Sequence, residues 1–149
     1  GNCTAYGTTY NYTYDTNGNQ LTKRYCSSVD SNGNCTAYSN SGAYDYTYDA
    51  NGNQLTSRTC SSFDSSGNCT AYNATSSYDY TYDANGNKLS KRLCTSHLNG
   101  VNCTAYEYSW DYTYDDNGKL IAEQTCDGSN LNTATGECIA YNSTTVQAY

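Results

Sequence analysis

The nine cysteines of this 149-residue chain are its most reactive side chains. Eight of them form four pairs, nine residues apart in three cases and twelve in the fourth: Cys26/Cys35, Cys60/Cys69, Cys94/Cys103 and Cys126/Cys138. Thiolates at these spacings, without any Cys-x-x-Cys, fit zinc or iron–sulfur sites poorly. Each pair instead brackets a turn-forming segment, and residues opposed across an antiparallel hairpin lie within disulfide reach. We therefore expect four disulfides, each closing one hairpin, and an extracellular or cell-surface location.

Cys3 lies outside these pairs. The segment Asn2-Cys3-Thr-Ala-Tyr6 matches Asn34-Cys35-Thr-Ala-Tyr38, so Cys3 corresponds to the second member of a pair whose first member is absent. One interpretation is that the sequence was cut from a longer array or has lost a leader. The chain opens with polar residues, so we expect no signal peptide in it. The other interpretation is a disulfide from Cys3 to a neighbouring subunit.

The Asp-x-Asn-Gly-Asn runs, such as residues 49–53, resemble the first half of a calcium-binding loop. An EF-hand loop requires glycine at its sixth position and a bidentate acid at its twelfth. Here glycine is fourth, and the twelfth residue is Cys60. Turn formation accounts for aspartate, asparagine and glycine without a metal. We expect no calcium and no other cofactor.

The sequence contains no recognisable catalytic constellation. The only histidine, His97, lies in the third cysteine loop without a serine–aspartate arrangement around it, and we expect it on a loop surface. Acids recur along the repeats at Asp45, Asp79 and Asp111, which predicts cross-strand pairing rather than a general acid–base pair. Phosphate-binding loops and nucleophile elbows are missing as well. We expect that the protein is not an enzyme.

The elements that position the cysteines are set by the stretch Tyr44-Asp-Tyr-Thr-Tyr-Asp-Ala-Asn-Gly-Asn-Gln-Leu55. It recurs at residues 10–21 and 78–89 and, with tryptophan in its first position, at 110–120. Aromatic residues at every second position predict a β-strand with its rings on one face, and the Asn-Gly pair predicts a tight hairpin turn. The expected aromatic ladder comprises Tyr10, Tyr12, Tyr14, Tyr44, Tyr46, Tyr48, Tyr78, Tyr80, Tyr82, Trp110, Tyr112 and Tyr114.

The chain repeats with a period of 34 residues: Tyr12, Tyr46 and Tyr80 keep this spacing, and Tyr112 follows 32 residues later. A weaker turn lies between the paired cysteines of each period, so strands of about 6 to 10 residues should connect turns on opposite edges. We expect one all-β domain, an antiparallel hairpin-repeat ribbon or meander that coils like a solenoid or spiral, with almost no helix. Its parts are repeat 1 (residues 1–34), repeat 2 (35–68), repeat 3 (69–102), repeat 4 (103–137) and a terminal edge strand (138–149).

The register within a hairpin has two alternatives. A two-residue type I′ loop at residues 51–52 places Tyr48 opposite Leu55 and Asp45 opposite Arg58. A three-residue loop with a glycine bulge instead places Tyr48 opposite Gln54. We prefer the first register because it pairs apolar with apolar and acid with base.

Composition limits both the core and the partners. Leucine, isoleucine, valine and phenylalanine total 13 residues against 19 tyrosines, so we expect a folded protein with a thin, tyrosine-dominated core. The formal charge of −7 and the lack of a basic patch argue against nucleic acid as a partner. No apolar run is long enough to span a bilayer.

The motif Tyr-x-Tyr-Asp-x-x-Gly-x-x-Leu, present as residues 46–55, resembles the YD repeat of RHS-type bacterial proteins and teneurins. Four strong copies and several weak ones extend the resemblance over nearly the whole chain. It implies a secreted or surface β-hairpin ribbon that spirals, often around a toxin or signalling domain, with no chemistry in the repeats themselves. Two features differ from that family: the repeat here is longer, and it contains cysteines at regular positions.

The function that these patterns favour is that of a secreted structural protein. We expect the strand near Cys3 and the segment 138–149 to form open edges without lysine or proline, which favours self-association into an extracellular filament or matrix. The alternatives are an adhesin or glycan-binding module that uses the tyrosine rows and Trp110, or a fragment of a YD-repeat toxin shell. Sequons also permit glycosylation at Asn2, Asn11, Asn73 and Asn142.

Overall fold

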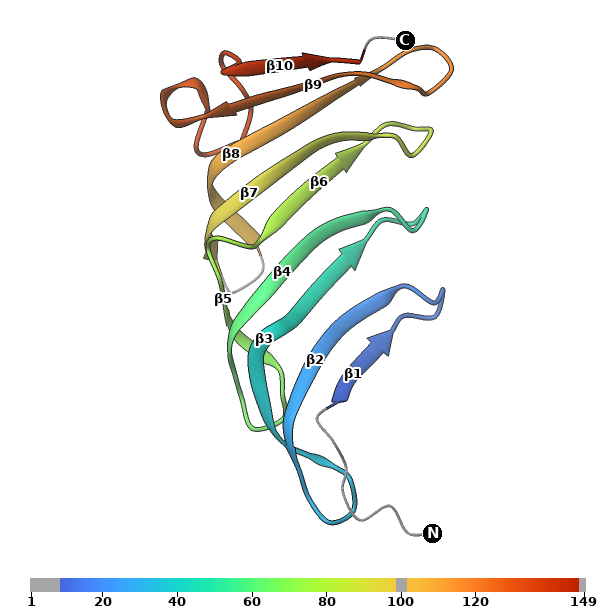
Figure 1. The fold of residues 1–149 in the computed structure, drawn as a ribbon, viewed down its shortest axis with the longest axis vertical. Coiled ribbons are helices and arrows are strands. Elements are labelled where there is room, and N and C mark those ends of the chain that lie inside the picture. The colour runs from blue at the N-terminus through green and yellow to red at the C-terminus, as the bar shows by residue number, and fades with distance from the viewer. Residues whose placement is uncertain (1–8, 99–101, 148–149) are drawn as a thin grey trace.

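The computed structural model describes residues 9–98 and 102–147, which form one antiparallel sheet without an α-helix (Figure 1). The expectation of an all-β meander of hairpins is confirmed. A single 3₁₀ turn, η1 (Gly128–Asn130), follows β9. No helix in this described part has the length and apolar character needed to cross a membrane. The strands are β1 (Thr9–Tyr14), β2 (Gln20–Val29), β3 (Cys35–Tyr48), β4 (Gln54–Phe63), β5 (Cys69–Tyr72), β6 (Tyr78–Tyr82), β7 (Lys88–Leu98), β8 (Asn102–Tyr114), β9 (Leu120–Asp127) and β10 (Ser143–Val146).

The strands lie in the sheet almost in chain order, as β1-β2-β3-β4-β6-β7-β8-β9-β10, with β5 paired to β4 beside this path. Two kinds of hairpin alternate. The tyrosine hairpins are β1–β2, β3–β4, β6–β7 and β8–β9, and the cysteine hairpins are β2–β3, β4–β5 and β7–β8. In Figure 1 the strands follow one another along the long axis of the molecule from β1 to β10, and the turns of the tyrosine hairpins all project on one side. The two outer strands are therefore β1 and β10.

Strand lengths run from 4 to 14 residues, a wider range than the period predicts. The longest strand, β3, shows the reason. The returning half of a cysteine hairpin continues without a break into the first strand of the next tyrosine hairpin. In the following repeat the same path is interrupted after Tyr72, which produces the two strands β5 and β6.

The terminal edge strand is shorter than the predicted segment 138–149. We expected this strand to begin at Cys138, and that boundary was wrong: Cys138 lies outside the strands and forms only an isolated bridge with Leu131. The reason is that the chain after β9 first folds into η1 and a loop. It returns to the edge of β9 at Asn142, whose N–H donates to the Thr125 carbonyl at 2.8 Å, and β10 begins at the next residue.

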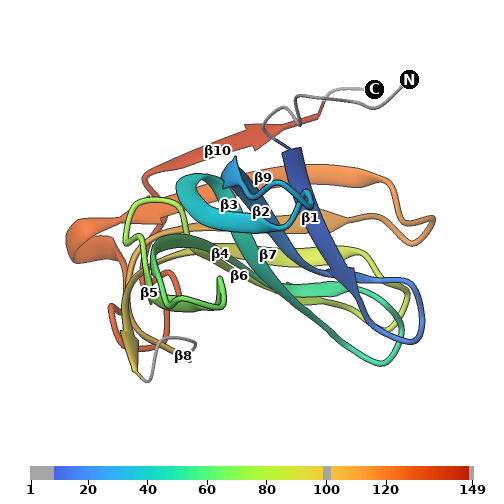
Figure 2. The ribbon, with the colours of Figure 1, turned by 90° about the horizontal axis from the view of Figure 1, so that it is seen from below.

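β-Bulges bend the strands where the two kinds of hairpin meet. The register between β2 and β3 shifts between Lys23 and Tyr25 and again on either side of Ser28. Similar shifts occur between β4 and β5 and between β7 and β8. A bulge bends its strand and increases the local twist. The cysteine hairpins therefore turn away from the tyrosine hairpins, and the sheet is strongly curved (Figure 2).

The register of the tyrosine hairpin combines the two alternatives that its sequence offers. Asp45 lies opposite Arg58, as the preferred register predicts. Tyr48, however, lies opposite Gln54 rather than Leu55, so the prediction was wrong beside the turn.

The turn geometry explains this mixed register. Gly52 has a φ of 84° and donates its N–H to the Asp49 carbonyl at 3.1 Å, while the Asp49 N–H bonds to the Asn53 carbonyl at 2.9 Å. This is a three-residue loop with glycine in the left-handed region, where it carries no Cβ penalty. A second register shift between Thr47 and Tyr48 then restores the pairing farther along the strands.

The buried residues differ from the tyrosine-dominated core that composition predicts. The half-buried Tyr44, Tyr46 and Tyr48 shield one another, because the described strands form one sheet and no second layer covers their face. On β1 the rings are still more exposed. The buried interior lies where the cysteine hairpins fold back, and it is rich in sulfur and polar groups. Its residues are Arg24, Cys26, Ala43, Arg58, Cys60, Ser77, Ser90, Cys94, Ser109, Cys126 and Leu131.

Candidate functional site

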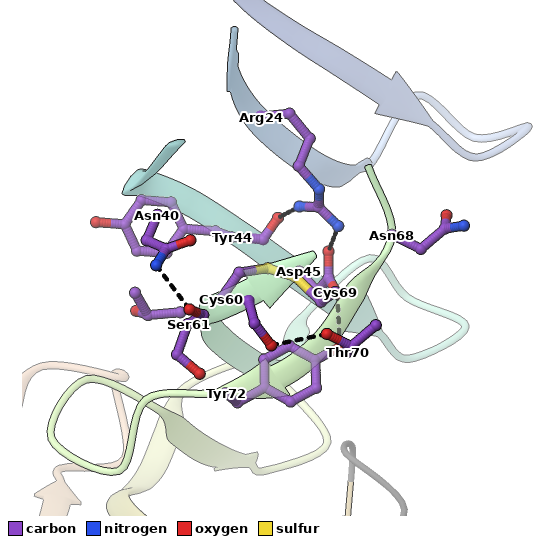
Figure 3. The surroundings of a disulfide bond; sticks show 12 residues. Arg24, Asn40, Tyr44, Asp45, Cys60, Ser61, Asn68, Cys69, Thr70 and Tyr72 are labelled. Carbon is purple, nitrogen blue, oxygen red and sulfur yellow. Dashed lines mark hydrogen bonds and ion pairs between the residues drawn. A yellow bond between two sulfur atoms is a disulfide. The ribbon is translucent and has the colours of Figure 1, made fainter. Parts of the chain in front are cut away.

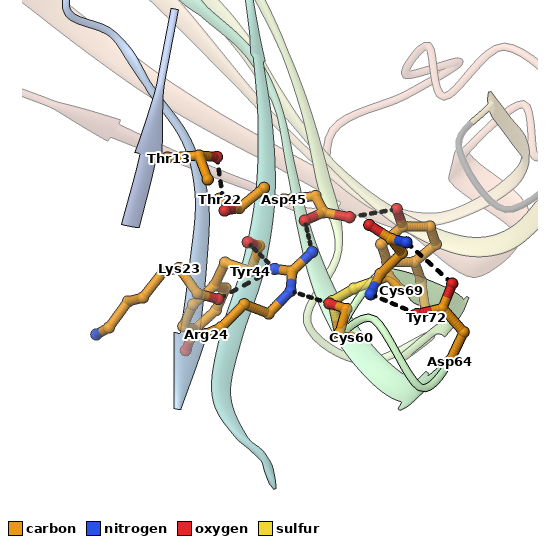
Figure 4. Close-up of polar contacts among 12 residues, drawn as sticks. Thr13, Thr22, Lys23, Arg24, Tyr44, Asp45, Cys60, Asp64, Cys69 and Tyr72 are labelled. Carbon is orange, nitrogen blue, oxygen red and sulfur yellow. Dashed lines mark hydrogen bonds and ion pairs between the residues drawn. A yellow bond between two sulfur atoms is a disulfide. The ribbon is translucent and has the colours of Figure 1, made fainter. Parts of the chain in front are cut away.

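An arginine–aspartate–tyrosine network links polar side chains of several strands (Figure 4). Arg24 on β2 forms an ion pair with Asp45 on β3. Its Nη1 donates to the Tyr44 carbonyl at 2.7 Å, and its Nε donates to the Gly67 carbonyl at 2.8 Å. The other carboxylate oxygen of Asp45 accepts the Tyr72 hydroxyl at 2.6 Å. One guanidinium thus joins two successive repeats.

The same network recurs in the next repeat. Arg58, which is 2% exposed, forms an ion pair with Asp79 and donates to the Tyr78 carbonyl at 2.6 Å. The Tyr106 hydroxyl donates to Asp79 at 2.5 Å. Burial and then the neighbouring carboxylate raise the pKa of both Tyr72 and Tyr106 above the ordinary tyrosine value.

The ion pairs connect successive tyrosine hairpins rather than the two strands of one tyrosine hairpin. Asp45 lies opposite Arg58 in register, but its ion pair is formed with Arg24 of the preceding hairpin. The acids therefore pair across strands, as expected, but the arginine that Asp45 binds is Arg24 rather than Arg58. At the C-terminal end the network changes, because Asp111 accepts Tyr141 and Ser109, each at 3.2 Å, in place of an arginine.

The tyrosines of this network were missing from the expected ladder. Each belongs to a Cys-x-Ala-Tyr segment: Tyr72, Tyr106 and Tyr141. The signal that could have found the first two is their 34-residue spacing, the same as that of the cysteines. Their hydroxyl partners, however, come from the preceding hairpin and lie 27 residues away in the chain.

The four cystines join the cysteine pairs that spacing predicts, with Cα–Cα distances of 5.6 to 5.7 Å. Figure 3 shows the second of them, Cys60–Cys69, packed between Asp45 and the strands of its hairpin. These three residues lie close enough together to suggest a metal site. Both sulfurs are consumed by the disulfide, however, and the Asp45 carboxylate is bound by Arg24 and Tyr72. Four such disulfides are typical of an oxidising compartment.

The fourth cystine, Cys126–Cys138, does not close a β-hairpin, and the expectation that all four would do so was wrong for this pair. Cys126 lies on β9 and is buried, whereas Cys138 is half-buried in the loop that follows η1. The physical reason is the longer link, since twelve residues separate these cysteines rather than nine. That length accommodates a 3₁₀ turn and a loop instead of two paired strands. The predicted partner of Cys138 is confirmed, but its predicted place on a strand is not.

The acids of the turns are also used internally. Asp49 accepts the N–H groups of Asn51 and Asn53 at 2.9 and 2.8 Å, and the Asn53 side-chain amide at 2.9 Å. These hydrogen bonds, led by that of the Asn53 side chain, lower the pKa of the Asp49 carboxyl. The other turns with this arrangement begin at Asp15, Asp30, Asp64 and Asp83. The carboxylates complete turns, as expected from turn chemistry.

The tyrosine face carries a mixed row of rings and lysines. Tyr108 and Trp110 have ring centroids 4.3 Å apart, and Tyr78 lies 6.3 Å from Trp110. The Lys91 ammonium is 4.2 Å from the Tyr78 ring and 4.6 Å from the Trp110 ring, within cation–π range. Burial raises the pKa of Tyr80 and Tyr112 to about 12.

The remaining predicted residues fall in different places. Asn11, Asn73 and Asn142 are exposed, and their glycosylation remains a prediction. Asn2 and Cys3 lie outside the described residues.

His97 is not on a loop surface, and that expectation was wrong. It lies on β7 opposite Cys103, half-buried, with its ring 5.7 Å from that of Tyr72. The reason is that the strands of this cysteine hairpin extend beyond the cysteines as far as Leu98 and Asn102.

No protein-family model and no curated protein match the chain. Among solved structures, the chain is similar to a protein of unknown function from Bacteroides fragilis, at 14% identity and a TM-score of 0.38, over 94% of this chain and 91% of that one. It is also similar to part of a TcdB2-TccC3-Cdc42 structure, at 17% identity and a TM-score of 0.28, over 83% of this chain and 8% of that one. Neither similarity is strong enough to assign the chain to a family.

Proposed function

We propose that the protein is a secreted structural repeat protein, a subunit that joins further copies at its sheet edges to build an extracellular filament or matrix. The observation that carries this proposal is the pair of outer strands. Within the described part of the chain, β1 pairs only with β2, and β10 pairs only with β9. An uncovered edge presents N–H and C=O groups that can pair with another chain. Neither strand contains the lysine or proline that blunts such edges.

The interior of the molecule also supports a structural role. The arginine–aspartate–tyrosine network and the cystines connect successive repeats, so these side chains are committed to holding the sheet together. The two outer strands of the sheet differ from each other, so a contact between them joins copies head to tail. Such a contact builds an assembly that grows without limit unless the rotation between copies closes a ring.

Electron microscopy and sedimentation of the purified protein test this proposal. We expect filaments or open-ended assemblies whose proportion rises with protein concentration. The variant Tyr12→Lys adds a charge to the outer strand β1 and should reduce assembly. Leu55→Lys is its matched control, because it adds the same charge at an exposed position away from both edges. Monodisperse monomers at high concentration would refute the proposal.

Binding of extracellular glycans is a second candidate function. It is favoured by the half-exposed rings of Tyr108 and Trp110 with Lys91 beside them. Such a row offers apolar ring faces and polar groups together. A glycan array with the native protein and Trp110→Ala tests it: binding that the substitution abolishes supports this function, and absence of binding by the native protein removes it.

A further inference from the structure

The last strand of the sheet begins another repeat. In the interior of the sheet the acid of each tyrosine hairpin lies opposite a small residue of the preceding strand: Asp45 opposite Thr22, Asp79 opposite Thr56 and Asp111 opposite Ser90. Val146 of β10 lies opposite Ala122 of β9 in the same way. Val146 therefore occupies the acid position, and β10 corresponds to the first strand of a tyrosine hairpin.

The first strand of the sheet is another copy of that same strand. Asn11 of β1 lies opposite Arg24, just as Asp45 lies opposite Arg58, so Asn11 also occupies the acid position. The sequence before the two outer strands matches as well. Cys-Thr-Ala-Tyr begins eight residues before Asn11, and Cys-Ile-Ala-Tyr begins eight residues before Val146. Equivalent strands of a repeat fit equivalent places, so β1 has the form of a strand that pairs with β9.

β10 fits its place on β9 less well than the interior strands fit theirs. It has four residues, all exposed. On either side of Val146, the repeat carries aromatic residues, but this segment carries Thr145 and Gln147. Gln124 of β9 lies opposite Asp111, in the position that arginine holds in earlier hairpins, and faces an acid position filled by valine. Its amide reaches only Thr144 Oγ1, at 3.3 Å.

β1 carries the groups that β10 lacks. It has six residues, and Tyr10 and Tyr12 flank Asn11 in the pattern of the interior strands. Asn11 in the acid position and Gln124 in the arginine position are both neutral, so their side-chain amides can hydrogen-bond to each other. This hydrogen bond would take the place of the ion pair that Arg24 and Asp45 form in the interior. Strands β1 and β9 thus carry a matched neutral substitute for the interior ion pair.

We propose that β1 of a second copy displaces β10 and pairs with β9, so that the sheet continues from one copy to the next. This inference rests on the proposed self-assembly and names its contact. Strand direction favours displacement over simple addition. β1 and β10 are equivalent strands, so in a continuing array they run in the same direction. If β1 of the next copy were added outside β10, these two strands would lie side by side in parallel. Displacement keeps the antiparallel alternation of every pairing in the sheet.

The exchange costs the incoming strand none of its own pairing. β1 bonds to β2 along one side, and its other side has no partner among the described residues. The receiving copy gives up the pairing of four residues in β10 and gains that of a six-residue strand. The incoming Tyr12 then continues the row formed by Tyr46, Tyr80 and Tyr112.

Cysteine cross-linking tests the register of this contact. In a Cys3→Ser background, Asn11→Cys combined with Ala122→Cys should give covalent chains of many copies on a non-reducing gel, because displacement places these residues opposite each other. The two residues lie on β1 and β9, strands near opposite ends of one sheet, so the bond can form only between copies. Each single substitution should give no more than dimers.

A second pair distinguishes displacement from simple addition. Asn11→Cys with Val146→Cys joins copies only where β1 lies beside an intact β10. Cross-linking of this pair and not of the first, with assembly retained, overturns the displacement and leaves the proposed function standing. If the native protein does not assemble at all, both the displacement and the proposed function are overturned.

Removal of the displaced strand provides an independent measurement. A chain ending at Asn142 lacks β10 and exposes β9 for the incoming β1. We expect it to assemble at a several-fold lower protein concentration than the full chain, as followed by sedimentation and light scattering. Unchanged or weaker assembly of this shortened chain, with its circular dichroism spectrum preserved, overturns the displacement.

Discussion

The Tyr72 hydroxyl lies 2.6 Å from Oδ2 of Asp45 and donates a hydrogen bond to it. Tyr72 ends β5, whereas Asp45 lies on β3 beside the ion-paired Arg24 of β2. One carboxylate therefore holds together a cysteine hairpin and the two strands before it. Because Arg58, Asp79 and Tyr106 repeat this arrangement, each repeat is fastened to its neighbour by buried polar contacts rather than by a large apolar core.

Removal of the second ion pair should strongly destabilise the fold. Asp79→Asn leaves the buried guanidinium of Arg58 without the carboxylate that neutralises it, and we expect a loss of about 3–5 kcal/mol in the free energy of unfolding. Chemical denaturation followed by circular dichroism measures this loss. The matched control is Asp111→Asn, since the Asp111 side chain accepts hydrogen bonds from the hydroxyl groups of Ser109 and Tyr141. It should cost about 1 kcal/mol; equal losses in the two variants contradict the prediction.

The strands, turns and disulfides were predictable from the sequence because their causes are local. Alternating tyrosines such as Tyr44 and Tyr46 fix which residues share a face, and the Asn-Gly pair fixes where the chain reverses. The nine-residue spacing of Cys60 and Cys69 around a turn predicts their disulfide, although in the observed register Cys60 lies opposite Tyr72 and Cys69 lies opposite Phe63. Cys138 shows the limit of this reasoning, because its longer link to Cys126 preserves the disulfide without the hairpin.

The network and the burial pattern depend on contacts between repeats, which no local pattern contains. Sequence spacing correctly placed Asp45 opposite Arg58, but the guanidinium pairs with Asp79 of the next hairpin. That choice depends on the bulges that turn the cysteine hairpins out of the plane of the sheet. The same bending buries the cystines and leaves the tyrosine face uncovered, so composition alone predicted the wrong core.

The cystines should contribute measurably to stability. Removing one with Cys60→Ala/Cys69→Ala opens a nine-residue link, and the chain-entropy model predicts a loss of about 2–3 kcal/mol. The control Ser62→Ala/Thr70→Ala removes a side-chain hydrogen bond from the exposed side of the same hairpin. Its loss should stay below about 1 kcal/mol, and denaturant unfolding of the three proteins measures the difference. A double-cysteine variant as stable as the control would contradict this account.

Alkaline pH should unfold the protein through its tyrosines. Burial raises the pKa of Tyr80 and Tyr112 from 10.0 to about 12, so the folded state favours their neutral phenols. The stability that they contribute is fully present below pH 10.0 and is lost as pH rises through the folded pKa, because the unfolded chain releases these protons first. Ultraviolet absorbance of tyrosinate should show a late-titrating class in the native protein. That class should be absent in urea, and a single class in both conditions contradicts the prediction.

A methyl group at position 67 should disrupt the contact between successive cysteine hairpins, because Gly67 lies in the β4–β5 turn and Tyr38 on β3. Gly67 has a φ of 82°, and a Cβ there would lie 2.5 Å from the Tyr38 ring, which in turn packs against Phe63. Gly18 has a φ of 88° but nothing within 4 Å of its Cβ position, so Gly18→Ala carries the backbone penalty alone, about 1–2 kcal/mol. Gly67→Ala should cost about 1–3 kcal/mol more because the ring must move. Denaturation of both variants measures this excess, and adding Tyr38→Ala should remove the clash. An equal cost for the two glycine substitutions would show that the two cysteine hairpins are not in close contact at this point.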